Sequence, residues 1–500
     1  MENFAACASI IAPPRVTAPS HPRTTPFPPE AERVRTSLRA RALQFWLSER
    51  MLFIGITGFL AGYLVMLNAE MQLLWLTVTC HPPLLASLLR SRGDGILRDP
   101  FMRVAGVFIL WNLTVGLVRN HSALSDPYTG DYLSGSVLLP LYLTGVWMVF
   151  RRVDGPRMVL RVILLSGAVA AVAGLIYWRM VLAVETPGAR LRNLLVHHGQ
   201  HPVSTAMNLS FAIVAGVTCY WTLRRPAVRG LLLLFLGIMT LAVMLTLSRG
   251  ALLALMCVPA SFVAALVGSA LYAMLKGRPL SDAIAPFGGP LLRSWPPMAV
   301  VALVGVWFIF YGGVLAPSIP PPPKGLPPNA EVIYLEKLSA VPVEEYFARE
   351  TSGRTTFYRV GLDQMNSWDK VLTGAGLWGP ELRLKEVTAP ILGSSGIDHF
   401  HSIFIATYIH GGVLGAALLG ALLFMGARRA LFLARAGQPQ WLALLTFGCT
   451  ALILDGQSLC SLVTHPRFES FILWFPLVGA AASASRLQTG GLQPSSSESR

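Results

Sequence analysis

The sequence predicts an all-α polytopic membrane protein with about twelve transmembrane helices, and three observations support this fold class. The 500 residues are 53% hydrophobic and only 13% charged, whereas a soluble protein of this size carries about 25% charged residues. Apolar runs recur along the chain that are long enough to cross a bilayer, because about 20 residues span its hydrocarbon core as a helix. The short alternating segments that are typical of a transmembrane barrel do not appear in the sequence.

The apolar runs divide the chain into two membrane segments, residues 43–315 with nine spans and residues 401–486 with three. A long polar loop, residues 316–400, separates them. The N-terminal tail, residues 1–42, is rich in Pro, Ala, Thr and Arg, and the C-terminal tail, residues 487–500, contains a run of Ser; both are expected to be disordered and cytoplasmic. The expected spans lie near 51–68, 71–89, 102–118, 135–150, 157–177, 203–223, 230–247, 251–274, 298–315, 402–426, 441–463 and 468–485.

The distribution of charge predicts the orientation. With twelve spans, both termini lie on one side of the membrane. That side carries 26 of the 40 Lys and Arg residues and 9 of the 25 acidic residues. The positive-inside rule places this side in the cytoplasm, so the loop 316–400 is expected to face the periplasm of a bacterial inner membrane. The net charge of +15 therefore reflects topology. No nucleic acid is expected as a partner, because no soluble domain carries a basic patch interleaved with aromatic residues.

The long loop is expected to fold as a small helical cap on the membrane helices. A proline run at 319–323 cannot be helical and predicts a stiff spacer. Apolar periodicity predicts helices at 331–350 and 354–368. Gly374 and Gly376 predict a turn over 371–376.

Two further outward connections are basic, which opposes the charge rule and predicts contact with an anion. The first, residues 179–202, contains Arg190, Arg192, His197, His198 and His201. The second is the tight turn 246–250, which places Arg249 at the outer membrane–water boundary. A metal site is not expected, since no acid or cysteine partners the histidine pair at ligand spacing and the six cysteines include no C-x-x-C pair.

Four motifs in order resemble the superfamily of O-antigen ligases and Wzy-type polymerases. They are Ser248-Arg249-Gly250 between two spans, Gly353-Arg354 at the start of a helical loop segment, the Gly374-Ala-Gly376 turn, and the helix that runs from His401-Ser-Ile-Phe-Ile to Gly412-Val-Leu-Gly415. The resemblance covers about residues 200–426. Two positions depart from the family pattern. Ser402 stands where the family often has an Asn after the histidine, and none of the three residues before Gly412 is an acid, although the family often has one two residues before this glycine.

The resemblance implies an integral glycosyltransferase of the GT-C type at the inner membrane. Its donor would be a glycan on undecaprenyl diphosphate. A ligase would transfer this glycan to lipid A–core, and a polymerase would transfer it to another lipid-linked glycan. The class needs no cofactor or nucleotide, and the reaction would invert the sugar carbon in one displacement.

The chemistry of such a transfer assigns roles to the basic residues. Arginine suits a diphosphate because its planar fork stays charged and binds phosphate oxygens in pairs, so Arg249 and Arg354 are the candidate diphosphate ligands. Histidine suits proton removal from an acceptor hydroxyl, and His401 is the candidate base. The further candidate substrate contacts are Arg359, His399, Arg190, Arg192 and His201.

Structural explanations compete with each of these roles. Arg249 could reach lipid headgroups as an interfacial arginine, and Arg354 could be a solvated start of a helix. Asp398 is expected to cap a helix, and His410 to pack or hydrogen-bond within its span. An intramembrane acid, Asp455, fits either a functional or a structural role.

Other functional classes stay open alongside the ligase. They are a polymerase of the same superfamily, a protein oligosaccharyltransferase, and a transporter or flippase for lipid or sugar. A transporter predicts a repeat and broken helices in matching halves, and the sequence shows neither. The transferase hypothesis predicts that Arg249, Arg354 and His401 converge within about 10 Å in one outward cavity.

Overall fold

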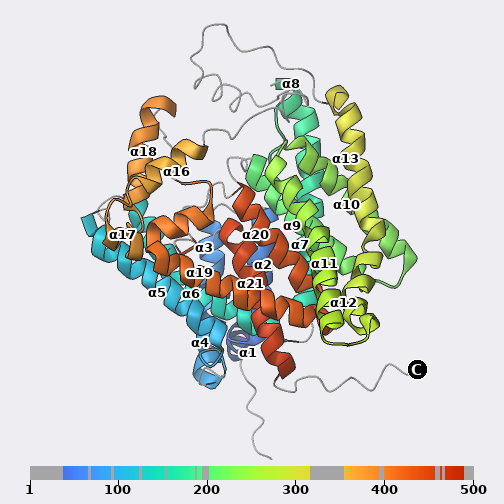
Figure 1. Ribbon diagram of the computed structural model, residues 1–500, viewed down its shortest axis with the longest axis horizontal. Coiled ribbons are helices and arrows are strands. Elements are labelled where there is room, and N and C mark those ends of the chain that lie inside the picture. Colours follow the sequence, from blue (N-terminus) through green and yellow to red (C-terminus); the bar gives the residue numbers. More distant parts are fainter. Residues whose placement is uncertain are drawn as a thin grey trace, which may run out of the picture. The chain divides into compact units, whose positions relative to one another are not determined.

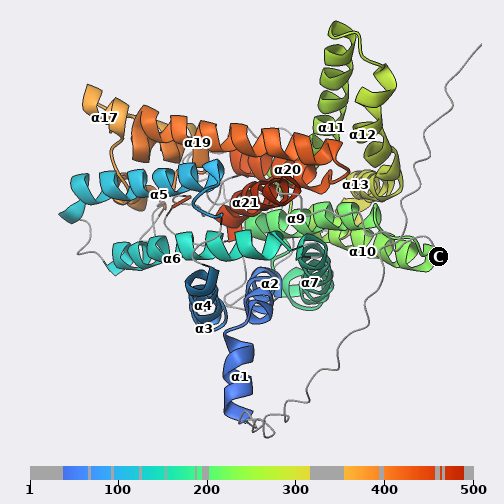
Figure 2. The same ribbon diagram turned by 90° about the horizontal axis from the view of Figure 1, so that it is seen from below.

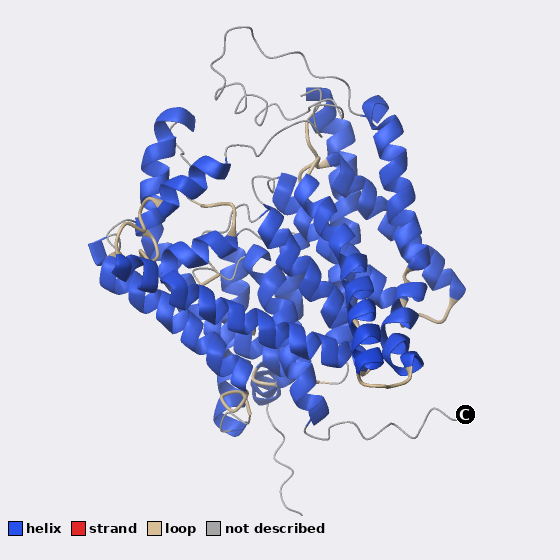
Figure 3. Ribbon diagram, viewed as in Figure 1, coloured by secondary structure: helices blue, strands red, loops and turns tan. Residues whose placement is uncertain are grey.

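The computed structural model describes residues 38–65, 69–91, 95–122, 127–152, 155–185, 189–193, 202–315, 354–392, 399–455, 462–463 and 468–488. Every described element is a helix (Figures 1 and 3). The predictions for residues 319–323 and 331–350, for His197, His198 and His201, and for Asp398 lie outside these residues.

Two compact units divide the chain, residues 1–44 and 45–500. Helix α1 (Leu38–Trp46) begins within the predicted N-terminal tail, and all other helices lie in the larger unit. They are α2 (Glu49–Val65), α3 (Ala69–Thr79), α4 (His81–Ser91), α5 (Pro100–Arg119), α6 (Pro127–Phe150), α7 (Gly155–Tyr177) with a π-helical turn (Trp178–Leu182) and α8 (Ala183–Glu185), α9 (Pro202–Tyr220), α10 (Pro226–Leu245), α11 (Arg249–Leu275), α12 (Leu280–Arg293), α13 (Trp295–Leu315), α16 (Arg354–Leu362), α17 (Trp368–Thr373), α18 (Gly379–Leu392), α19 (Ile403–Arg435), α20 (Gln440–Asp455) and α21 (Phe468–Gln488).

Fewer helices qualify as membrane spans than the sequence predicted. Among the described residues, six helices are long and apolar enough, and seven if the bent pair Ala283–Arg293 and Trp295–Phe308 counts as one. Each of the twelve predicted spans overlaps a described helix, and the apolar helical stretches Leu74–Leu89, Leu139–Phe150 and Gln440–Leu454 stay below 18 residues. The part of the chain that the structure describes is therefore all-helical, with six or seven candidate membrane spans.

Two helices depart from the predicted connections. Residues 276–293 were expected to be a connection, but α12 occupies most of this segment and meets α13 at a bend of 48°. Helix α19 runs 33 residues to Arg435, through a segment that was expected to be a basic connection. Alternating apolar and small residues carry the helical pattern past the arginines there.

Helix α9 is the centre of the larger unit. All of its residues are buried, and it packs against α7, α10, α11, α20 and α21. The outer helices instead expose large apolar side chains, including Leu303 and Phe310 on α13 and Leu110 and Val118 on α5. This pattern is the one expected where lipid replaces water around a bundle.

The pairing of α5 with α19 positions the loop helices. The two helices run side by side (Figure 2). At one end, Arg429 of α19 binds Asp99 of α5 through two nitrogen–oxygen contacts of 2.9 and 3.0 Å. Asp99 also caps α5 by accepting a 2.8 Å hydrogen bond from the backbone of Phe101. This buried bidentate pair fixes the register of α5 against α19.

The described loop helices pack on the beginning of α19, as the sequence predicted. Phe400, Ala406 and Ile409 form a small apolar core with Leu384 of α18. Helix α16 contributes Phe357 and Val360 to the same core. At Gly361 a Cβ atom would lie 2.3 Å from Ile409 and 2.6 Å from Phe400, so only glycine allows this approach of α16 to α19.

Candidate functional site

Arg249 is the first residue of α11, at the end of a three-residue turn that follows α10. Ser248 caps α11 by accepting a hydrogen bond from the backbone of Ala251. Leu247 has a φ of 54°, which is unusual for a branched side chain. A cation at a helix N-terminus opposes the helix dipole, whereas an anion there would be stabilised by both the amides and the guanidinium.

The segment 189–193 lies against this turn. Leu191 donates its backbone N–H to Leu245 at 3.0 Å, and the Nε atom of Arg190 donates to the carbonyl of Thr246 at 2.6 Å. Arg190 is thereby held beside the turn that carries Arg249. Arg192 is exposed on the same segment. The structure thus brings together two of the predicted arginines from loops that are more than fifty residues apart.

His401 lies immediately before α19, whose N-cap is Ser402. It is buried and has a φ of 53°. Its ring lies 4.3 Å from the ring of His399 and stacks on Phe357 of α16, with centroids 5.3 Å apart and planes at 21°. The predicted cap was Asp398, and the described cap of α19 is Ser402.

The stacking contact links His401 to the helix that begins with Arg354. Phe357 lies three residues after Arg354, so the start of α16 is close in space to His401, 47 residues further along the chain. Arg359 is exposed in the last turn of α16. This helix is shorter than the predicted 354–368, because the chain turns at Asp363 and resumes as α17 at Trp368.

Helix α19 is broken at Gly412, and the glycine turn of the loop fills the break. Gly412 has φ 64° and ψ −160°, a conformation that only glycine adopts readily. The freed carbonyl groups accept hydrogen bonds from the turn, from Ala375 to Ile409 at 2.7 Å and from Gly376 to His410 at 3.1 Å. The Gly374-Ala-Gly376 turn and the helix break at Gly412 are therefore in direct contact.

A buried pair of titratable side chains lies behind this contact. The Nε2 atom of His410 is 2.5 Å from the Oε1 atom of Glu381 on α18, and both side chains are at most 5% exposed. His410 was expected to pack or hydrogen-bond within its span, and its partner was not predicted. Glu381 follows Gly379-Pro380 at the start of α18, and this Pro followed by an acid is a signal for a helix start that could have revealed it.

The end of α5 supplies three more contacts that the sequence analysis missed. Trp111 donates its indole N–H to the carbonyl of Gly411 at 3.0 Å. Asn120 donates to the carbonyl groups of Ala375 and Leu377 at 3.0 and 2.7 Å. All three acceptors belong to the contact between the glycine turn and the broken helix. Hydrogen bonds from α5 therefore stabilise this contact in addition to the bonds between the turn and α19.

Arg119 attaches α17 to α5. Its Nη2 atom lies 2.9 Å from Asp369 and 2.7 Å from the hydroxyl of Thr373. Hydrogen bonds from Ser367 and from Arg119 hold the pKa of Asp369 at about 2, below its usual 3.8. The carboxylate is therefore charged throughout the physiological range.

The predicted residues fall into two groups. Arg249, Arg190 and Arg192 surround the turn between α10 and α11, whereas His401, His399 and the helix of Arg354 and Arg359 surround the start of α19. Strained backbone marks both groups, since Leu247 and His401 are two of the three non-glycine residues with positive φ in the described chain. Such strain is frequent at functional sites.

Residues 231–420 match the family model Wzy_C, described as O-antigen ligase. The match includes Arg249, Arg354, Arg359, His399 and His401 together with both glycine motifs, and it lies within the range of the resemblance seen in the sequence. Among curated proteins, no match to this sequence was found. Residues 231–420 are therefore similar to the O-antigen ligase domain.

Proposed function

We propose that the protein transfers a glycan from undecaprenyl diphosphate to an acceptor hydroxyl at the periplasmic face of the bacterial inner membrane. Lipid A–core is the acceptor that fits best. The family match to O-antigen ligase supports membrane glycan transfer. The observation that carries the residue roles is the position of Arg249 and Arg354 as the first residues of α11 and α16, and of His401 immediately before the N-cap of α19.

The diphosphate is the leaving group, and its negative charge grows as the glycosidic bond breaks. Arg249 and Arg354 each combine a guanidinium with the amide groups of a helix N-terminus, so each can bind phosphate oxygens from two kinds of donor. Donors that are fixed before the reaction stabilise this charge without reorganising. Arg190 lies beside Arg249 and, with Arg192 and Arg359, is a secondary contact for the donor.

The acceptor hydroxyl attacks the anomeric carbon of the donor sugar. Its oxygen forms the new glycosidic bond, the bond to the diphosphate oxygen breaks, and His401 takes the hydroxyl proton. The diphosphate leaves with the bonding electron pair, and the sugar carbon is inverted. Stacking on Phe357 and the contact with His399 fix the orientation of the His401 ring, which is what a general base needs.

The glycine contact and the His410–Glu381 pair have a positioning role in this proposal. They join the loop helices to α19 at Ile409 and His410, about two helical turns after His401 in the chain. The acid that the family pattern places near Gly412 is absent from α19, and Glu381 supplies a carboxylate to the same region from α18 instead. The start of α19 and the start of α16 are thereby kept in one arrangement.

Deletion of the gene and analysis of the surface polysaccharide test this proposal. Loss of glycan attached to lipid A–core supports a ligase, and attachment of single repeats instead supports a polymerase. Restoration by the wild-type gene and by Lys276→Gln, but not by His401→Gln, ties the phenotype to the proposed site. Unchanged surface glycans contradict both assignments, and accumulation of glycan on the cytoplasmic side favours a flippase.

A further inference from the structure

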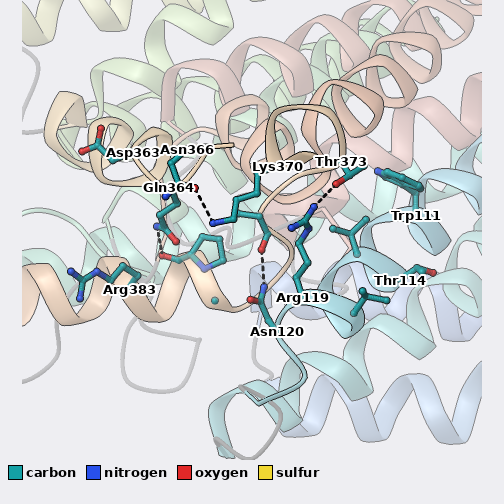
Figure 4. A pocket seen from close by; sticks show the side chains of 15 residues that line it. Trp111, Thr114, Arg119, Asn120, Asp363, Gln364, Asn366, Lys370, Thr373 and Arg383 are labelled. Atoms are coloured by element: carbon teal, nitrogen blue, oxygen red, sulfur yellow. Dashed lines mark hydrogen bonds between the residues drawn. The ribbon is translucent and has the colours of Figure 1, made fainter. Parts of the chain in front are cut away.

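An open pocket of about 990 Å³, lined by both polar and apolar side chains, lies where the end of α5 meets the loop helices (Figure 4). Its wall includes Trp111, Arg119, Gln364, Asn366, Lys370 and Arg383. None of the residues that the sequence predicted for the site lines this cavity. Its volume is at the upper end of the range for small-molecule sites, which is enough for a ligand of several rings.

The charge of the cavity wall favours an anion. The lining residues include three cations, Arg119, Lys370 and Arg383, and one carboxylate, Asp363. Arg119 is already paired with Asp369, so Lys370 and Arg383 are the cations that a ligand can use. Lys370 donates to a neutral amide, Asn366, at 3.2 Å. Arg383 pairs with Glu386 at 3.0 Å, and both side chains are more than 60% exposed. Exposed pairs of this kind contribute little stability, so Arg383 can exchange its partner for a ligand at small cost.

The remaining groups suit a molecule with many hydroxyls. Gln364 donates to the carbonyl groups of Val360 and Pro380, and these bonds leave its side-chain oxygen as an acceptor. Asn366 and Thr114 are exposed at the wall. Hydroxyl and amide groups can both donate and accept hydrogen bonds, and this matches a sugar better than a bare ion.

Trp111 offers a fixed aromatic surface in the same wall. Its indole N–H is bound to Gly411, so the plane of the ring is set by α19. A rigid aromatic ring gives a large contact area at low entropic cost. A pyranose ring has an apolar face formed by its C–H groups, and this face can pack on the indole.

We propose that this cavity binds a saccharide that carries a phosphate or carboxylate group. The inference rests on the proposed function for the source of that saccharide, either the acceptor or the donor glycan. Two cavity residues also support the site described above. Trp111 binds Gly411 and Asn120 binds Ala375, so a saccharide here contacts the scaffold that positions the start of α19.

Binding can be measured without catalysis, using the full-length protein in lipid nanodiscs. The probe is phosphorylated core oligosaccharide released from lipopolysaccharide by mild acid, compared with the same oligosaccharide after removal of phosphate by hydrofluoric acid. We expect the phosphorylated probe to bind about tenfold more tightly.

The double variant Lys370→Gln/Arg383→Gln is expected to lose this difference. Lys276→Gln, an exposed lysine at the far end of α11, is the matched control and should keep it. Equal affinity for both probes in the wild type, or an unchanged difference in the double variant, overturns the proposal.

Steady-state transfer with both substrates varied identifies the source of the saccharide. An increase of the acceptor KM in the double variant, at constant kcat and donor KM, assigns the cavity to the acceptor. An increase of the donor KM alone assigns it to the donor glycan. Two unchanged KM values refute the role in substrate binding. His401→Gln should bind the probe normally and lose transfer. A wild-type protein that binds the probe but catalyses no transfer contradicts the proposed function and leaves the cavity assignment intact.

Discussion

Replacement of Gly412 by alanine should release the loop helices from α19. The residue has φ 64° and ψ −160° in the middle of α19. A Cβ atom there would lie 2.4 Å from the carbonyl oxygen of Leu372 and 2.5 Å from the backbone nitrogen of Gly374. Both neighbours are backbone atoms, so no side-chain rotation relieves the clash, and the glycine turn must move away.

The expected cost follows from two terms. A non-glycine residue in this region of φ and ψ costs about 1–3 kcal/mol, and forcing an extra methyl group into a packed contact costs about 1–3 kcal/mol. Gly412→Ala should therefore destabilise the contact by roughly 2–6 kcal/mol. Gly420→Ala is the matched control in the same helix, because nothing lies within 4 Å of its Cβ position. It should be neutral or stabilising by up to about 1 kcal/mol.

Thermal unfolding of the purified variants in detergent, together with the rate of tryptic cleavage in the loop helices, measures this effect. Gly412→Ala should lower the midpoint and expose Lys370 and Arg383 to faster cleavage, and it should reduce glycan transfer. Gly420→Ala should behave as the wild type in all three assays. Equal stability and equal cleavage of the two variants would refute the claim that the glycine turn fills the break in α19.

Three further predictions concern single side chains. Glu381→Gln should lower the thermal midpoint, because it disturbs a buried pair worth about 1–3 kcal/mol, whereas Glu386→Gln, exposed on the same helix, should leave the midpoint unchanged. Arg249→Lys should raise the donor KM or lower kcat of transfer at least tenfold, since an ammonium cannot bind phosphate in a fork, while Arg293→Lys should change neither. The pKa of Asp369 lies below its unfolded value, so the contribution of its contacts is present above about pH 4 and is lost as the pH falls towards 2. Hydrogen exchange in α17, corrected for intrinsic rates, should accelerate over this range in the wild type but show no such step in Asp369→Asn.

The sequence predicted the features that depend on neighbouring residues. The position of Arg249 followed from two apolar runs separated by a short polar turn, and that of His401 from the change from polar to apolar residues at the start of α19. Both are confirmed as helix starts, with Ser248 and Ser402 as caps. Local rules are sufficient here because caps and turns depend on a few adjacent residues.

Features that depend on distant residues were missed. Glu381 and His410 are brought together by the fold of the loop, and Trp111 meets Gly411 from three hundred residues away. The break at Gly412 also has no local signal that separates it from an ordinary glycine in an apolar helix. Among the described residues six or seven helices are long and apolar enough to be spans, so the twelve spans predicted from hydropathy stay a prediction.

Glycan transfer by the purified protein in proteoliposomes tests the central claim most directly. The assay supplies glycan on undecaprenyl diphosphate and lipid A–core, and it follows the initial rate of the wild type, His401→Gln and Lys276→Gln. We predict glycosylated lipid A–core with the wild type and Lys276→Gln, and a rate lower by about 10²–10⁴ with His401→Gln. No product with the wild type, or equal rates for His401→Gln and the wild type, would contradict the account.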